Sequence, residues 1–201
     1  FYRRIMDNPK KFLSDNIPVF FYKFDTEVPF TNCSLCDGLL SGYNKYAIEK
    51  VFKQNRVLNT SEIVYEYAIC WNCAQTSGSD ISDDSKNAIM SLFAEHRDFI
   101  AMKTDYLHAN QMYNIESWIE RCSLTGKEVR LCNEYAISAI IEHDKLLYEH
   151  SPMVVSDEFM EKLQSVLSKE TKDKFDGLRD KILDGSPSVE DLIFSPTPGV
   201  L

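Results

Sequence analysis

Two Cys-x-x-Cys pairs, Cys33/Cys36 and Cys70/Cys73, are the residues of this chain whose types and spacing could do chemistry. Each pair places two sulfur atoms on one short turn, where both can bind the same cation. Four thiolates arranged in two such pairs are typical of a closed, tetrahedral zinc site. The sequence therefore predicts one structural zinc ion, held by Cys33, Cys36, Cys70 and Cys73.

Two other interpretations of the cysteine pairs remain open. A rubredoxin-like iron site uses the same four sulfur ligands, and Cys70-Trp-Asn-Cys73 could be a redox dithiol. The βαβ pattern that surrounds the redox motif in thioredoxin-like proteins is absent, and four sulfur ligands leave zinc no open position for a substrate. We therefore favour zinc, and we expect the protein not to be an enzyme.

The segments around the cysteines must bring the two pairs together. Cys33–Gly38 has the form of a zinc knuckle, in which Gly38 is expected to take a positive φ. Alternating apolar residues predict strands over Tyr46–Phe52 and Ile63–Ile69, joined by a polar loop over 54–61. Ser77–Asp80 is expected to be a turn, after which Ser82 is expected to begin a long helix that runs to Phe99.

This order of knuckle, hairpin, second cysteine pair and helix resembles the treble-clef zinc fingers over roughly residues 30–96. The resemblance implies that the second cysteine pair lies at the start of a helix. The interval between Cys73 and Ser82 is longer than that pattern prefers. A zinc ribbon, with a knuckle at each end of a hairpin, is the nearest alternative.

A second feature of the sequence is a pair of short motifs that are repeated 89 residues later. Cys33-Ser-Leu recurs as Cys122-Ser-Leu, and Asn44-Lys-Tyr-Ala-Ile recurs as Asn133-Glu-Tyr-Ala-Ile. We therefore predict an α+β protein in which a four-cysteine zinc finger is followed by a related, metal-free αβ unit with C-terminal helices. The expected units are residues 1–110 and 111–201.

The second unit keeps one cysteine of the four. In the alignment that we predict, Cys122 matches Cys33, and three other residues take the remaining ligand positions: Thr125 for Cys36, Met153 for Cys70 and Ser156 for Cys73. Because one sulfur cannot hold zinc, Cys122 and Cys132 are expected to be buried free thiols. Helices are expected over Asn114–Arg121, Asp157–Leu167 and Thr171–Leu183, before an extended, proline-containing tail.

Composition narrows the classes of function. The 201 residues are 44% hydrophobic and carry a net charge of −9, which disfavours a general affinity for nucleic acid or for an anionic membrane. Residues 81–201 hold 13 basic and 22 acidic residues, so all of the excess negative charge lies there. No apolar run is long enough to span a membrane. Cysteines with metal-ligand spacing indicate a reducing compartment, the cytoplasm.

Motifs of the common enzymes are missing. No histidine lies between Cys36 and Cys73, where a treble-clef nuclease would carry its metal ligand, and no glycine-rich phosphate loop occurs. The sequence therefore favours a cytoplasmic module that binds another protein and whose zinc is structural. The alternatives are a nucleic-acid-binding zinc finger, using Arg3, Arg4, Lys10 and Lys53, and an enzyme whose site the sequence does not reveal.

Overall fold

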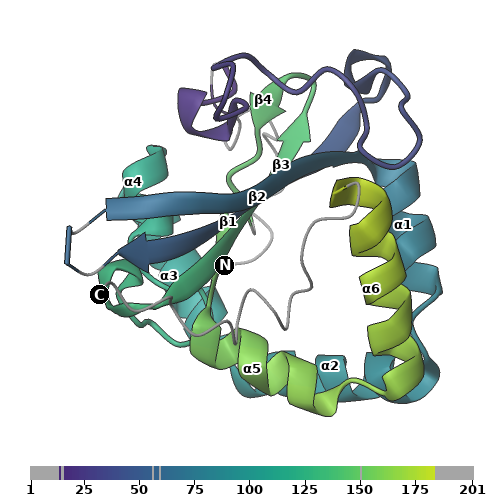
Figure 1. The fold of residues 1–201 in the computed structure, drawn as a ribbon. Coiled ribbons are helices and arrows are strands. Elements are labelled where there is room, and N and C mark those ends of the chain that lie inside the picture. Colours follow the sequence, from purple (N-terminus) through teal and green to yellow (C-terminus); the bar gives the residue numbers. More distant parts are fainter. Residues whose placement is uncertain (1–13, 15, 56, 59, 150, 184–201) are drawn as a thin grey trace, which may run out of the picture.

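In the computed structural model, one antiparallel sheet carries helices at its edge and across one side (Figure 1). The structure describes residues 14, 16–55, 57–58, 60–149 and 151–183. The sequence also predicts a short, locally basic helix over Tyr2–Leu13. This segment, with Arg3, Arg4, Lys10 and Lys11, and the tail Ser186–Leu201 lie outside the described residues. The α+β class is confirmed.

The strands that the structure describes form a sheet in the order β2-β1-β3-β4, and β5 also pairs with β3. Their bounds are β1 Lys45–Asn55, β2 Thr60–Cys70, β3 Glu134–Glu142, β4 Lys145–Leu146 and β5 Met153–Ser156. Both strands expected near the cysteines are present but longer, because their pairing continues almost to the tip of the hairpin, past a register shift between Val51 and Phe52. The sheet is continuous across the two halves of the sequence because β1 pairs with β3.

Helices occur between and after the strands. Their bounds are α1 Trp71–Ser79, α2 Asp83–Glu95, α3 Arg97–Ala109, α4 Ile115–Ile119, α5 Asp157–Val166 and α6 Lys169–Leu183. The long helix expected from Ser82 to Phe99 is two helices, which meet at His96. The side chain of Ser82 caps α2, as expected, by accepting a hydrogen bond from the backbone N–H of Ser85.

Helices from opposite halves of the chain pack in pairs. Figure 1 shows α1 beside α6, and α2 beside α5, on the side of the sheet away from α4. The first pair is joined by a hydrogen bond from the Lys174 ammonium to the carbonyl of Asp80. Each half of the sequence therefore contributes one helix to each pair, so the halves are interlocked.

The main core lies between the sheet, the 3₁₀ turn Val19–Phe21 and α4. Phe21 is fully buried there, and the ring of Phe52 stacks on those of Phe20 and Tyr135. Trp118 packs in the same core, as expected for this tryptophan, and its indole N–H donates to the carbonyl of Met112. A smaller cluster around Phe159 and Cys122 lies between α2 and α5.

One carboxylate fixes the start of α5 against β3. The Asp157 carboxylate accepts hydrogen bonds from the backbone N–H of Asn133 at 2.7 Å and from the Lys127 ammonium at 3.1 Å. Burial acts to raise the pKa of Asp157, but these bonds, with one from the N–H of Glu158, outweigh it and hold the pKa below its ordinary value.

This arrangement predicts a pH-dependent contribution to stability. A carboxyl group whose pKa is lowered on folding stabilises the protein above its unfolded pKa of about 4, and the contribution disappears as the pH falls further. We expect Asp157→Asn to cost on the order of 1–3 kcal/mol at pH 7, and less as the pH drops below about 4. Urea unfolding of both proteins between pH 7 and pH 3 measures the difference. A difference that does not change with pH would contradict this account.

Candidate metal centre

The four predicted ligand cysteines converge at one end of the sheet. The Sγ atoms of Cys33, Cys36, Cys70 and Cys73 all lie within 4.8 Å of one another, and those of Cys36 and Cys70 are 3.9 Å apart. Zinc–sulfur bonds of about 2.3 Å in a tetrahedron place neighbouring sulfurs about 3.8 Å apart. Among the described residues, no other group of three or more His, Cys, Asp or Glu side chains is close enough to share a metal ion. The cluster is therefore positioned to hold one metal ion.

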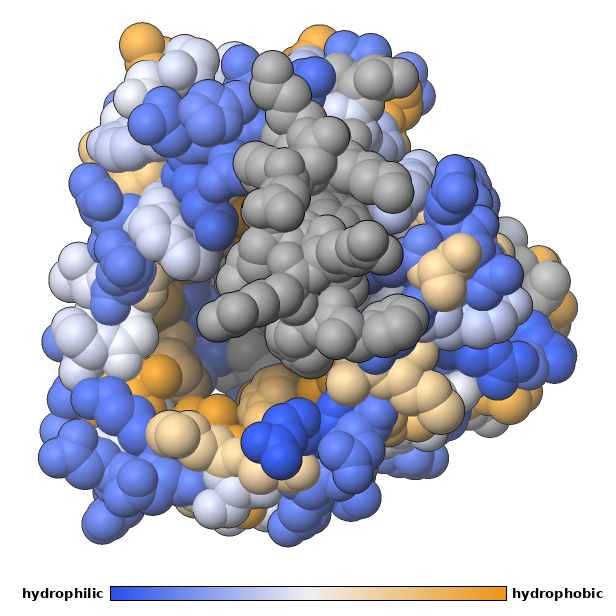
Figure 2. All heavy atoms as spheres, turned by 180° about the vertical axis from the view of Figure 1, so that it is seen from behind, coloured by the Kyte–Doolittle hydropathy of each residue, from blue (hydrophilic) through white to orange (hydrophobic). Residues whose placement is uncertain are grey.

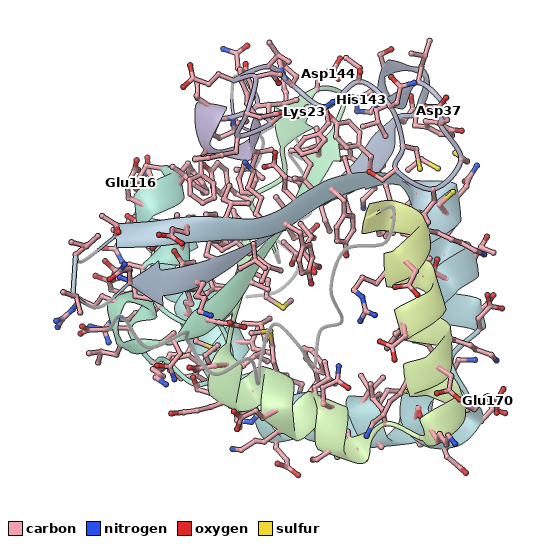
Figure 3. All side chains as sticks on the ribbon, viewed as in Figure 1. Lys23, Asp37, Glu116, His143, Asp144 and Glu170 are labelled. Carbon is pink, nitrogen blue, oxygen red and sulfur yellow. The ribbon has the colours of Figure 1, made fainter. Side chains whose placement is uncertain are left out.

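The knuckle positions the first pair. The backbone N–H of Cys33 donates to the carbonyl of Gly38, and the N–H of Asp37 donates back to the carbonyl of Cys33. These bonds close a tight turn, which an antiparallel bridge between Asn32 and Leu39 extends. In Figure 3, sulfur atoms lie beside Asp37 at this end of the molecule. The knuckle predicted from the sequence is present.

Gly38 is needed for a different reason from the one expected. Asp37, and not Gly38, takes the positive φ, at 56°. A Cβ atom on Gly38 would lie 2.8 Å from the hydroxyl oxygen of Tyr43 and 3.4 Å from the sulfur of Cys36. The glycine therefore leaves room for the Tyr43 hydroxyl, which lies 4.0 Å from the Cys36 sulfur. The sequence did not single out Tyr43 as a neighbour of the cluster.

The second pair lies at the start of a helix. Cys70 is the last residue of β2 and the N-cap of α1, and its sulfur accepts from the backbone N–H of Cys73 at 3.5 Å. The expected turn at Ser77–Asp80 is wrong for most of its length, because α1 continues to Ser79. The long interval before Ser82 is thus filled by a helix that begins at the second pair. This removes the departure from the treble-clef order noted in the sequence.

Electrostatics of the cluster favour a bound cation. Burial acts to raise the pKa of Cys33, but backbone hydrogen bonds from Cys70, Leu35 and Cys36 outweigh it and lower the pKa to about 7. Burial and the neighbouring sulfurs of Cys70, Cys36 and Cys33 raise the pKa of Cys73. The first thiolate therefore forms readily, whereas further negative charge is disfavoured. A divalent cation removes this conflict, since metal binding and ligand deprotonation are coupled.

The residues present fit a metal with four sulfur ligands. If Cys33, Cys36, Cys70 and Cys73 all bind, the metal has no open position for a substrate or a water molecule. The ion would then supply cross-linking: it joins the knuckle to the end of β2 and the first turn of α1. Cys33 and Cys70 are buried, whereas Cys36 is exposed, so one edge of the cluster faces the solvent.

Trp71 and two of the histidines have structural contacts. The Lys45 ammonium lies over the ring of Trp71, 4.4 Å from its centroid, at the start of α1. His96 packs edge-on against Phe159, and His108 packs against Trp118. None of these histidines belongs to the cysteine cluster.

Two of the three residues expected around Cys122, Thr125 and Ser156, lie beside it. The prediction that Cys122 and Cys132 are buried free thiols is confirmed. Burial acts to raise the pKa of the Cys122 thiol, but the neighbouring hydroxyl groups of Ser156 and Thr125 and the backbone N–H groups of Leu124 and Thr125 outweigh it and lower the pKa. Met153 instead pairs with Ser138 at the start of β5. The predicted alignment of the second pair was therefore wrong by three residues.

Comparison of the chain with protein-family models, with curated proteins and with solved structures found no significant match to any of them.

Proposed function

We propose that this protein is a cytoplasmic protein-interaction module whose single zinc ion is structural. The observation that carries the proposal is that four sulfur atoms from the knuckle and from α1 converge at one point, so that the ion joins these elements and has no open position. We propose zinc and not iron because four thiolates in two Cys-x-x-Cys pairs are the typical ligand set of a structural zinc site. The order of knuckle, hairpin and helix supports a treble-clef resemblance over about residues 30–96.

The loop that the zinc ion would hold offers a surface for a partner. Phe24 and Leu39 belong to the segment around the knuckle and are 69% and 62% exposed. A hollow of about 700 Å³ lies in the same segment, and Phe30, Leu35 and Glu66 contribute to its lining. Exposed apolar side chains beside a hollow are typical of a protein-binding surface. Figure 2, by contrast, shows a face dominated by hydrophilic side chains.

Two further features support parts of the proposal. All six cysteines are free thiols, including Cys36 and Cys70, which are close to each other, and this favours a reducing cytoplasm. Among the described residues, none of the helices has the length and apolar character that a bilayer crossing needs. We further propose that residues 1–110 and 111–201 are two related units which share one sheet, and which therefore fold together.

A matched pair of surface variants tests the interaction proposal. We expect Leu39→Ser to abolish the capture of a specific protein from a cytoplasmic extract, because Leu39 lies beside the knuckle. Leu58→Ser is the control: Leu58 is 67% exposed but lies at the β1–β2 hairpin tip. Quantitative mass spectrometry of captured proteins makes the comparison. Equal capture by both variants, or no protein that distinguishes Leu39→Ser from the wild type, would contradict the proposal.

The net negative charge of the chain disfavours nucleic-acid binding, which is the main alternative function. Because the net charge is −9, we expect no tight binding to duplex DNA at physiological salt. Fluorescence anisotropy with a labelled duplex measures this. Micromolar affinity that falls steeply as the salt concentration rises would contradict the prediction and favour the nucleic-acid alternative.

A further inference from the structure

The backbone around Cys122 repeats the backbone of the knuckle. The N–H of Cys122 donates to the carbonyl of Lys127, and the N–H of Gly126 donates to the carbonyl of Cys122, as in the turn at Cys33 but 89 residues later. An antiparallel bridge joins Arg121 to Glu128, 89 residues after the bridge that joins Asn32 to Leu39 in the knuckle. Gly126 also takes a positive φ, at the position that corresponds to Asp37.

The strand and helix that complete the metal centre are repeated as well. The N–H of Ser34 donates to the carbonyl of Ala68, and the N–H of Ser123 donates to the carbonyl of Val154. Each serine hydroxyl in turn accepts from the N–H of the same strand residue. Tyr46 pairs with Cys70 in one half, as Tyr135 pairs with Ser156 in the other.

These hydrogen bonds fix how the two halves correspond. From β2 and β5 onward, equivalent residues are 86 positions apart and not 89, because the second half has three residues fewer between its knuckle and its helix. Cys70 and Ser156 are the N-caps of α1 and α5, which therefore begin at equivalent positions. The position of Cys73 in α1 is thus occupied by Phe159 in α5, and that of Cys36 by Thr125.

Contacts between the halves have the reciprocity of a two-fold axis. In the β1–β3 pairing, Lys45 lies opposite Glu142, and Lys53 lies opposite Glu134. At a separation of 89 residues, Glu134 is the counterpart of Lys45, and Glu142 is the counterpart of Lys53. The two pairs therefore exchange places when the halves are exchanged. The same holds far from the sheet. Ser82 and Ser168 cap α2 and α6, and their hydroxyl oxygens are 2.9 Å apart.

The reciprocal bonds at these caps are both present. The backbone N–H of Ser82 donates to the Thr171 hydroxyl, and the N–H of Ser168 donates to the Ser85 hydroxyl. Paired contacts of this kind are what two copies of one unit make in an isologous dimer. The chain thus has the architecture of two dimerised units fused in one polypeptide, and each unit contains one knuckle–helix site.

We infer that the cluster around Cys122 is a degenerate counterpart of the metal centre, which keeps the backbone and one of the four cysteines and has Thr125, Ser156 and Phe159 in place of the other three. The Ser156 hydroxyl is fully buried in this cluster, and its oxygen has no hydrogen bond that meets normal geometry to a described residue, although it lies next to the Cys122 sulfur. Burying a hydroxyl without a hydrogen bond lowers the stability of the folded protein. The Ser156 hydroxyl occupies the position that the Cys70 sulfur occupies in the first site. Phe159 fills the remaining position with an apolar ring that packs on Phe93.

Restoring the three ligands tests the inference. We expect the variant Thr125→Cys/Ser156→Cys/Phe159→Cys to bind two zinc ions per chain, against one for the wild type. The control is Thr125→Cys/Met153→Cys/Phe159→Ala, which also loses the Phe159 ring but adds its second thiol at Met153, the residue that pairs with Ser138. It is expected to stay at one zinc ion. Elemental analysis of the purified proteins, refolded in zinc and dialysed, gives the ratios.

A second variant covers the case in which loss of the Phe159 ring prevents folding. Thr125→Cys/Ser156→Cys keeps that ring and offers three thiols, and we expect it to bind one additional Cd²⁺, detected by the sulfur-to-cadmium absorption band. Thr125→Cys/Met153→Cys is its control, and no additional Cd²⁺ is expected there. No second metal ion in either restored variant, or equal binding by the controls, would overturn the inference. A wild type without zinc would contradict the proposed function but would leave the comparison between restored variants and controls intact.

Discussion

Replacing Cys70 with serine is expected to unfold the knuckle end of the protein. Structural zinc supplies apparent folding free energy on the order of 10 kcal/mol in small zinc domains, and a serine hydroxyl does not replace a thiolate ligand. Cys70 is 1% exposed, so the change also removes a buried sulfur. Serine is the most informative substitute, because a serine hydroxyl at the N-cap can accept the hydrogen bond from the Cys73 N–H that the Cys70 sulfur accepts. The variant therefore separates loss of the ligand from loss of the helix cap.

Urea unfolding, followed by circular dichroism with and without a chelator, measures this effect. We expect the chelator to destabilise the wild type strongly and to change the Cys70→Ser variant little. Cys132→Ala is the control, because Cys132 is a fully buried free thiol outside the cluster. It should cost on the order of 1 kcal/mol and keep the chelator sensitivity of the wild type. Equal losses in the two variants would mean that the cluster contributes only packing.

Replacing Glu66 with alanine is expected to have the next largest effect. The Lys50 ammonium, which is 3% exposed, lies 2.7 Å from the Glu66 carboxylate and also donates to the carbonyl of Tyr22. The same carboxylate accepts from the backbone N–H of Phe24 at 2.7 Å. Removing one partner of a buried ion pair leaves the other charge uncompensated and costs about 3–5 kcal/mol. The change should also release the segment around Phe24 from β2.

Two control variants separate the buried charge from the strand. Glu62→Ala alters an exposed glutamate on the same strand and should cost less than about 1 kcal/mol. Lys50→Met/Glu66→Leu removes both charges and should be less destabilising than Glu66→Ala alone. Denaturant unfolding of the four proteins gives the comparison. A loss in Glu66→Ala no greater than that in Glu62→Ala would contradict the role assigned to the pair.

The convergence of the four cysteines was predictable because much of the signal for it is local. Cys-x-x-Cys spacing alone brings two sulfurs to one turn, and the strands between the pairs show period-two alternation. Helix α1 was expected only from the treble-clef resemblance, and the length of this helix was not predictable. Its Gly78 and its polar residues have weak helix propensity, and the helix forms where Cys70 caps it at the end of β2.

The internal repeat was visible only where the residues remained identical. Ser123 of the repeated Cys122-Ser-Leu motif makes two hydrogen bonds to Val154 of β5. Ser34 makes the same two bonds to Ala68 of β2, which explains why this motif is shared. The counterparts of Cys70 and Cys73 were misaligned in the sequence, because β5 resembles β2 in its strand pairing and not in its side chains. Pairing with β3 fixes Ser156 opposite Tyr135, and that long-range register has no local sequence signal.

The central claim is that Cys33, Cys36, Cys70 and Cys73 form one zinc site and that the cluster around Cys122, as it stands, binds no metal. Elemental analysis of the purified wild-type protein, prepared without chelator, tests both parts at once. We predict one zinc ion per chain, because the four cysteines are positioned to hold one metal ion, and a ratio near zero or near two would contradict this.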